Sequence, residues 1–173
     1  MSAGRGRSRR RFHVGPARIF LATKNPDKAA ELGAILEPYG IGVLGPEVIR
    51  DLPSAVEDGA TFRDNAVKKA LHYSRYVDGP VLADDSGLEV EALDGRPGVR
   101  SARLGGPSAS DADRVRLVLN QLEGVEWERR GARFRCVLAA ARADDLLQTF
   151  DGQVEGRITF EPAGAAGFGY DPI

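Results

Sequence analysis

The segment from Val81 to Leu88, Val-Leu-Ala-Asp-Asp-Ser-Gly-Leu, constrains the fold of this chain more than any other. Aliphatic residues that run into two carboxylates and then a Ser-Gly break predict a buried strand that stops at Ser86. Neighbouring side chains on a strand point to opposite faces, so only one of Asp84 and Asp85 can face a given site. Acids at a strand end predict a metal site or a catalytic base in an α/β protein; the alternative is a pair that only caps a turn.

The composition excludes several kinds of site. The 173 residues predict one domain with a sizeable core. A single cysteine, Cys136, excludes an internal disulfide and a cysteine zinc site, and two histidines, His13 and His72, are too few for a histidine-metal cluster. A net charge of −1 gives no general attraction to nucleic acid or membrane. No apolar run reaches the roughly 18 residues that span a bilayer, so we expect a cytoplasmic protein.

The N-terminus differs from the rest of the chain. Residues 4–11 carry five arginines and no apolar residue. This pattern predicts a disordered basic tail over residues 1–16 and a folded domain over residues 17–173. The alternatives are a targeting peptide and a nucleic-acid-binding arm, and the arm would bind with a steep dependence on salt.

The first folded segment predicts a phosphate site. Residues 18–22 form an apolar strand, Asn25 is an expected N-cap, and Pro26 suits the first position of a helix. Thr23, Asn25 and Lys28 therefore lie on a strand-to-helix loop. Such a loop offers backbone N–H groups, a hydroxyl and an ammonium, which together favour a phosphate group.

A second helix is predicted after an acidic loop. Residues 41–49 read as a strand and residues 51–59 as the loop, and Thr61 then begins the helix. Thr61, Asn65 and Lys69 recur every four residues and share a polar face, whose ordinary destination is solvent. The apolar stripe of this helix consists of Phe62, Ala66, Ala70 and Tyr73.

Lysine is restricted to these two segments. The chain has 20 arginines and only four lysines, namely Lys24, Lys28, Lys68 and Lys69. The ammonium of lysine is a compact point charge that suits a phosphate. The distribution suggests that these two segments bind a phosphate group.

The second half of the chain predicts a further helix, a pair of strands and a glycine-rich end. The helix begins at Ser110 or Asp111, and the strands cover residues 132–143 and 146–160. Residues 164–172 contain too much glycine for regular structure but include two aromatic residues and an acid. An aromatic ring on such a loop can stack on a nucleobase.

Together these segments resemble the inosine triphosphate pyrophosphatase family, enzymes that hydrolyse non-standard purine nucleoside triphosphates. The resemblance covers residues 18–173. It rests on Leu21–Lys28, Glu57–Phe62, Asp64–Ala66 with Lys69–Ala70, Ala83–Leu88, Gly95–Gly98 with Ser101–Arg103, and Phe168–Pro172.

The resemblance implies an α/β fold, with an elongated central mixed β-sheet flanked by helices in two lobes and a nucleotide cleft between them. It also implies Mg²⁺ as cofactor and a homodimer. By the matching motifs, Glu57 and Asp85 would bind Mg²⁺, and Asp85 would also be the general base. The residues implied to contact the nucleotide are Thr23, Lys24, Asn25, Lys28, Lys69, Ser86, Phe168, Gly169, Tyr170 and Asp171.

The implied chemistry matches these residue types. Water attacks the α-phosphorus and pyrophosphate leaves, so negative charge builds up that Mg²⁺ and lysines can neutralise, while a carboxylate activates the water. We therefore expect hydrolysis of ITP, dITP and XTP to the monophosphate and pyrophosphate. The alternatives are a house-cleaning pyrophosphatase for other nucleotides and a non-catalytic nucleotide-binding remnant.

One departure from the family concerns the C-terminus. Family members continue with a segment that carries a lysine and a Ser-His-Arg motif, which read the 6-oxo edge of the purine, whereas this sequence stops at Ile173. The expectation is a C-terminally truncated member in which selectivity for the base is the property most affected.

Overall fold

The structure is a computed structural model that describes residues 12–13, 18–164 and 167–173, and it divides into two compact units. The first unit comprises the described residues up to Asp58, with Asn65–Asp84 and Ala139–Thr149; the second comprises Gly59–Asp64, Asp85–Leu138 and Phe150–Ile173. The strand order of the main sheet is β3-β2-β5-β7-β8, with β6 paired to β5. Parallel and antiparallel pairs both occur, which confirms the predicted mixed sheet flanked by helices.

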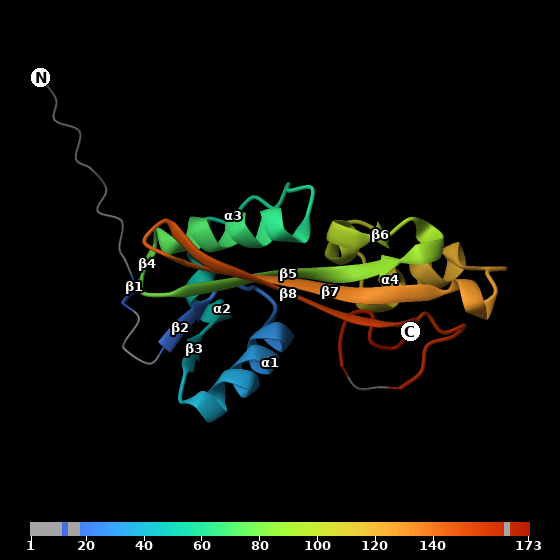
Figure 1. Ribbon diagram of the computed structural model, residues 1–173, viewed down its shortest axis with the longest axis horizontal. Helices are drawn as coiled ribbons and strands as arrows, with labels where there is room; N and C mark the ends of the chain where they lie inside the picture. Colours follow the sequence, from blue (N-terminus) through green and yellow to red (C-terminus); the bar gives the residue numbers. More distant parts are fainter. Residues whose placement is uncertain (1–11, 14–17, 165–166) are drawn as a thin grey trace, which may run out of the picture. The chain divides into compact units, whose positions relative to one another are not determined.

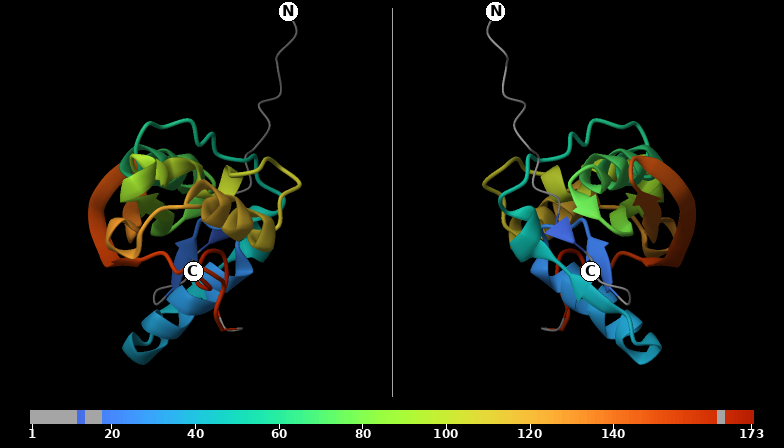
Figure 2. Two further views of the ribbon diagram at one scale, coloured as in Figure 1. Left: turned by 90° about the vertical axis from the view of Figure 1, so that its right-hand side faces the viewer. Right: turned by 90° about the vertical axis from the view of Figure 1, so that its left-hand side faces the viewer.

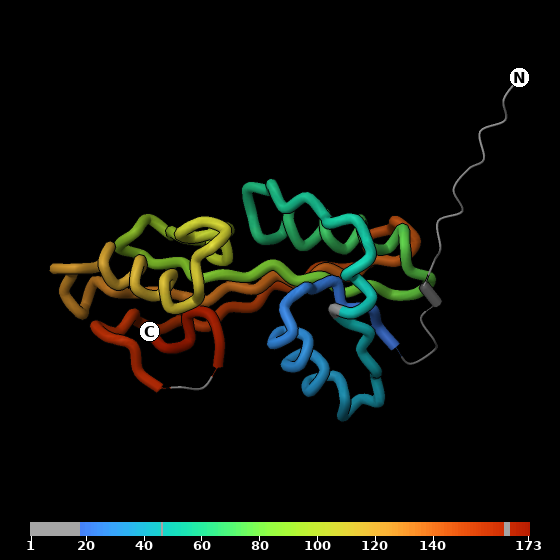
Figure 3. The backbone as a smooth tube through the Cα atoms, turned by 180° about the vertical axis from the view of Figure 1, so that it is seen from behind, coloured from blue at the N-terminus to red at the C-terminus, as the bar shows by residue number. Residues whose placement is uncertain are grey.

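The first unit is a parallel α/β arrangement. Strand β2 (Arg18–Leu21) pairs in parallel with β3 (Gly42–Leu44) on one side and with the start of β5 (Val81–Val90) on the other. Helix α1 (Pro26–Leu36) connects β2 to β3, and α3 (Phe62–Ser74) precedes β5. The two helices lie on opposite faces of these strands in Figure 1 and from behind in Figure 3, and the side views of Figure 2 agree.

This connectivity creates a topological switch point. The chain leaves the central strand β2 for β3 on one side and returns to β5 on the other. The connection from β2 to β3 contains α1 and the connection from β3 to β5 contains α3, so the two connections run on opposite faces of these strands (Figure 1). In open α/β sheets, ligands bind at the carboxyl ends of strands where this divergence occurs.

Two segments of the first unit differ from the sequence expectations. The strand predicted over residues 41–49 is correct only for Gly42–Leu44, because Pro46 begins a short helix, α2 (Pro46–Ile49). Proline has no N–H for a strand ladder, and its fixed φ suits the first helical position. Of the predicted basic tail over residues 1–16, only Phe12–His13 is described; it forms β1, which pairs in parallel with β4 (Val77–Asp78).

The second unit contains the rest of β5 and most of the C-terminal half. Strand β6 (Arg96–Pro97) is antiparallel to β5, and α4 (Asp111–Gln121) begins at the N-cap Ser110, as predicted. The long strands β7 (Gly131–Arg142) and β8 (Asp145–Arg157) run through both units. Short 3-10 helices occur at Glu37–Tyr39, Glu91–Leu93, Gly98–Arg103 and Trp127–Arg129.

The core of the second unit joins α4, β5 and the C-terminal loop. Its buried members are Leu88, Val90, Leu93, Val115, Val118, Leu122, Ile158 and Tyr170. Val115 and Val118 of α4 and its C-cap residue Leu122 are therefore the residues that this helix buries in the core. Within the described ranges, no helix has the length and apolar character needed to cross a membrane.

Strand β5 does not stop at Ser86, contrary to the sequence prediction, and continues to Val90. The Ser-Gly pair does not break the strand, because the missing side chain of Gly87 lets Ser101 approach the backbone closely. Ser101 Oγ accepts a hydrogen bond from Leu88 N–H at 2.9 Å and donates one to Gly98 O at 2.7 Å. A Cβ at position 87 would collide with Ser101 Oγ and would lie 2.7 Å from Gly98 O.

Gly87→Ala is therefore expected to lower the free energy of unfolding by about 2 kcal/mol, the typical cost of forcing extra atoms into a packed site. Denaturant titration measures this loss. Gly156→Ala is the matched control, because a Cβ on that strand residue would meet no atom within 4 Å. Equal stability of the two variants would contradict the proposed reason for glycine at position 87.

Candidate active site

The loop between β2 and α1 has the capped geometry that the sequence predicted. Asn25 Oδ1 accepts hydrogen bonds from Asp27 N–H at 2.8 Å and Lys28 N–H at 3.4 Å, which confirms Asn25 as the N-cap. The buried hydroxyl of Thr23 accepts a hydrogen bond from Asn25 N–H at 3.1 Å. These bonds fix the direction in which the chain leaves β2, and they place the side chain of Lys28 on the first turn of α1.

Asp84 is the centre of the polar cluster in the first unit. Its side chain is buried and accepts a hydrogen bond from Lys28 Nζ at 2.5 Å. Its backbone carbonyl accepts one from Lys69 Nζ at 2.8 Å, and Lys69 also forms an ion pair with Glu57 at 3.1 Å. Two ammonium groups from different helices thus meet at the carboxyl ends of β2 and the parallel part of β5, which is the switch point.

Sequence reasoning missed the part that Asp84 plays. The alternation of strand side chains correctly indicated that Asp84 and Asp85 have different surroundings, and the resemblance directed attention to Asp85. In the structure Asp84 is buried, whereas Asp85 and Ser86 are half-buried in the part of β5 that belongs to the second unit. The signal that would have identified Asp84 is its charge, since a buried carboxylate requires a cation and lysines are few in this chain.

The loop that carries Glu57 is fixed along α3. Four contacts connect residues 53–58 to one stretch of the helix. They join Pro53 O to His72 Nε2 (2.7 Å), the Ala55 backbone to the Tyr73 hydroxyl, Glu57 to Lys69, and Asp58 to Lys68 (2.6 Å). Burial raises the pKa of the Tyr73 phenol, which therefore remains neutral. Glu57 is held in place beside Lys69 while 38% of its side chain stays exposed.

Of the predicted polar face of α3, Thr61 is exposed as expected, whereas Asn65 and Lys69 do not face solvent. Asn65 is completely buried, and the side chain of Lys69 is only 13% exposed. Thr61 and Asp64 exchange two hydrogen bonds of 3.1 Å at the start of the helix, as the predicted capping box requires. Lys24, by contrast, extends to Ser54 Oγ at 2.7 Å and is not among the lysines that contact Asp84.

The C-terminal loop over Phe168–Asp171 is a closed turn in the second unit. Asp171 Oδ2 accepts a hydrogen bond from Phe168 N–H at 2.9 Å. The buried hydroxyl of Tyr170 donates to Ser101 O at 2.8 Å, and burial raises the pKa of this phenol to about 12. Tyr170 and Asp171 therefore stabilise the loop itself, whereas Phe168 and Gly169 are half-buried and remain accessible.

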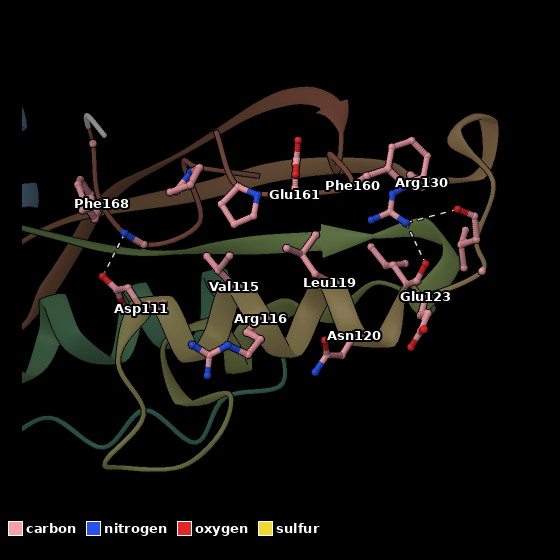
Figure 4. Close-up of a pocket in the computed structure, with 18 of the residues that line it drawn as sticks. Asp111, Val115, Arg116, Leu119, Asn120, Glu123, Arg130, Phe160, Glu161 and Phe168 are labelled. Atoms are coloured by element: carbon pink, nitrogen blue, oxygen red, sulfur yellow. Dashed lines mark hydrogen bonds between the residues drawn. The ribbon is translucent and has the colours of Figure 1, made fainter. Parts of the chain in front are cut away.

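A cavity of about 1050 Å³ lies between α4 and the C-terminal loop within the second unit (Figure 4). At one end Arg130, 2% exposed, donates to the carbonyls of Leu122, Val125, Ile158 and Thr159. The charged residues that line the cavity are Asp111, Arg116, Glu123, Glu126, Arg130 and Glu161. Carboxylates outnumber guanidinium groups there, so this cavity is unsuited to a triphosphate, in contrast to the lysine cluster of the first unit.

The expected metal ligands, Glu57 and Asp85, fit Mg²⁺ only if substrate phosphates and water supply its other ligands. Among the residues that the structure describes, no group of three or more histidine, cysteine, aspartate or glutamate side chains could hold a metal ion. Mg²⁺ commonly takes one or two carboxylates and completes its shell with substrate phosphates and water. Glu57 is a partly exposed carboxylate beside the lysine cluster and meets that requirement.

Comparison with known proteins identifies the family. The Ham1 family model matches residues 19–173. The chain is 45% identical over 156 residues to a dITP/XTP pyrophosphatase of Geobacter sulfurreducens, covering 90% of this chain and 78% of that protein. It is 46% identical over 154 residues to a dITP/XTP pyrophosphatase of Bacillus subtilis, covering 89% and 78%.

Solved structures agree with the sequence comparison. A HAM1 protein from Coxiella burnetii superposes with a TM-score of 0.80 at 40% identity, covering 91% of this chain and 81% of that chain. A protein from Mycobacterium abscessus described as a nucleoside-triphosphatase and dITP/XTP pyrophosphatase superposes with a TM-score of 0.72 at 39% identity, covering 90% and 80%. The resemblance that the motifs indicated is confirmed, and the chain belongs to the Ham1 family.

Proposed function

We propose that this protein hydrolyses the deaminated purine nucleotides ITP, dITP and XTP to the monophosphate and pyrophosphate, and so removes them from the nucleotide pool. The observation that carries the proposal is the convergence of Lys28 and Lys69 on Asp84 at the switch point of the sheet. Membership of the Ham1 family, and relatives named dITP/XTP pyrophosphatases, support this substrate class.

Lys28 and Lys69 hold the triphosphate in this proposal. Each ammonium has three N–H donors, of which Asp84 accepts one from each lysine. A phosphate oxygen accepts from Lys28 beside Asp84, and it replaces or shares the contact between Lys69 and Glu57. The side-chain amide of Asn25 adds N–H donors, and the N-terminus of α1 adds a positive dipole end beside the same position.

The reaction breaks one phosphoanhydride bond. A water oxygen forms a bond to the α-phosphorus, while the bond from that phosphorus to the oxygen that bridges to the β-phosphorus breaks. The bonding electrons leave with pyrophosphate, and a proton of the water passes to the carboxylate of Asp85. The ammonium groups of Lys28 and Lys69 stabilise the charge that develops on the leaving group.

We also propose Mg²⁺ as the cofactor, with Glu57 and Asp85 as protein ligands. When bound, the metal would supply further neutralisation of charge on the phosphate oxygens. The exposed part of the Glu57 carboxylate, held beside Lys69, is the observation that favours this assignment. Ser86 follows Asp85 directly in β5, and we assign it to contact with the nucleotide.

The remaining assignments concern the base, the oligomer and the compartment. Phe168 is the aromatic residue of the C-terminal loop whose ring we assign to the base, because Tyr170 is committed to the core.

A homodimer is part of the proposal, supported by exposed apolar side chains on the edge strand β8, which are Leu146, Leu147, Phe150 and Val154. Nucleotide pools lie in the cytoplasm, and we place the activity there.

A substrate panel tests the proposal. With Mg²⁺ present, ITP, dITP and XTP are expected to be turned over faster than GTP and ATP. Monophosphate and pyrophosphate should form in equal amounts, and chelation of the metal should reduce turnover to background. A preference for pyrimidine or modified nucleotides would favour the house-cleaning alternative, and binding without turnover would favour a nucleotide-binding remnant.

A further inference from the structure

The loop over Phe168–Asp171 is held by two anchors of different kinds. The first anchor is the buried hydrogen bond that the Tyr170 hydroxyl donates to Ser101 O, and Tyr170 belongs to the core of the second unit. The other anchor lies at the surface, where Gly169 N–H donates to Asp111 Oδ2 at 3.1 Å (Figure 4). Asp111 occupies the first turn of α4, so this second bond connects a helix to the part of the loop next to Phe168.

The carboxylate of Asp111 is itself held from the other side. Its Oδ1 accepts a hydrogen bond from Arg114 Nη1 at 2.8 Å, one helical turn further along α4. Only 16% of the Arg114 side chain is exposed, whereas 56% of the Asp111 side chain is. An acid in the first turn of a helix is also favoured by the helix dipole. Asp111 is therefore fixed by groups that belong to α4 and presents its second oxygen to the loop.

These bonds determine what the loop can offer a ligand. The N–H groups of Phe168 and Gly169 donate to Asp171 and Asp111, respectively. Both amides are thereby oriented into the protein's own carboxylates. The loop then presents the ring of Phe168 to a nucleotide, and the position of that ring depends on the peptide that Asp111 fixes.

We propose that Asp111 is a positioning residue for nucleotide recognition, which holds the Phe168–Gly169 peptide so that the Phe168 ring meets the base. The inference rests on the proposed function and extends it. Asp111 touches neither phosphates nor reacting atoms in this assignment, so its loss affects ligands that carry a base and spares ligands that consist of phosphate alone.

The test compares Asp111→Ala with Asp113→Ala, a matched control on the same turn of α4. Asp113 forms the capping box with Ser110 and an ion pair with Arg116, and none of these bonds reaches the described residues 167–173, so its removal weakens the helix end only. In Asp111→Ala, hydrogen exchange over residues 167–173 should accelerate in the protein without ligand. The dissociation constant for dIMP should rise about 3- to 10-fold, as expected for loss of one hydrogen bond, and that for pyrophosphate should stay unchanged.

Asp111→Asn should restore part of the dIMP affinity, because its amide oxygen can still accept from Gly169 N–H. Unchanged exchange in Asp111→Ala, or a parallel loss of pyrophosphate affinity, would overturn the inference. A parent protein that binds pyrophosphate but not dIMP would overturn it and leave the phosphate chemistry intact. A parent that lacks turnover but shows dIMP affinity dependent on Asp111 would support the inference and reject the proposed function.

Discussion

Asp85→Asn is expected to lower the turnover number for dITP about 10³-fold, within the range that general-base catalysis provides. The substitution keeps the size of the side chain and removes the proton acceptor and negative charge that the proposed reaction assigns to Asp85. Steady-state kinetics with release of pyrophosphate measures the effect. Because Asp85 is half-buried at a continuous part of β5, the thermal midpoint should change little.

Two further variants make this experiment specific. Asp145→Asn, which changes an exposed residue at the start of β8, should leave turnover unchanged. Asp84→Asn is compared with Asp85→Asn, because Asp84 is the other carboxylate that could act as the base. Asp84 Oδ2 already accepts a hydrogen bond from Lys28, so we assign Asp84 to holding the lysine and not to activating water. If Asp84→Asn abolished turnover in a folded protein while Asp85→Asn retained it, the base assignment would move to Asp84.

Features determined by neighbouring residues were predictable from the sequence. The cap at Asn25, the proline that follows it and the capping box at Thr61 depend on atoms within four residues, and all three occur as predicted. The side chain of a capping residue accepts hydrogen bonds from backbone N–H groups two or three residues away, so the local sequence alone determines its partners. The loop between β2 and α1, to which we assign the phosphate, was therefore located correctly as a capped helix start before any tertiary contact was known.

Features that depend on distant residues were not predictable in the same way. Ser86–Gly87 reads locally as a strand end, but Ser101, 14 positions after Gly87, closes on the glycine and the strand continues. Similarly, nothing beside Asp84 in the sequence indicates that Lys28 approaches it across the sheet. In both cases tertiary packing overrides a local signal, and both lie next to the proposed reaction site.

Lys28→Met is expected to affect stability and activity together. It removes one of the two lysines assigned to the triphosphate, and it leaves the buried Asp84 carboxylate without the ammonium at 2.5 Å. Breaking a buried ion pair is costly because the remaining charge stays desolvated; we expect a loss of about 3 kcal/mol, the lower end of that range, since Lys28 is 25% exposed. Denaturant titration measures the loss, and the KM for dITP should rise in parallel.

A double-mutant cycle separates the two effects. In Lys28→Met with Asp84→Asn neither member of this pair carries a charge, so most of the stability should return while the KM stays high, because the phosphate still lacks its cation. Lys68→Met is the control for a surface pair: both Lys68 and its partner Asp58 are largely exposed, and stability should hardly change. If the double variant stayed as unstable as Lys28→Met, the lysine would act through packing of its aliphatic chain. If it also recovered the parental KM, Lys28 would not be a phosphate ligand, and the switch-point assignment would depend on Lys69 alone.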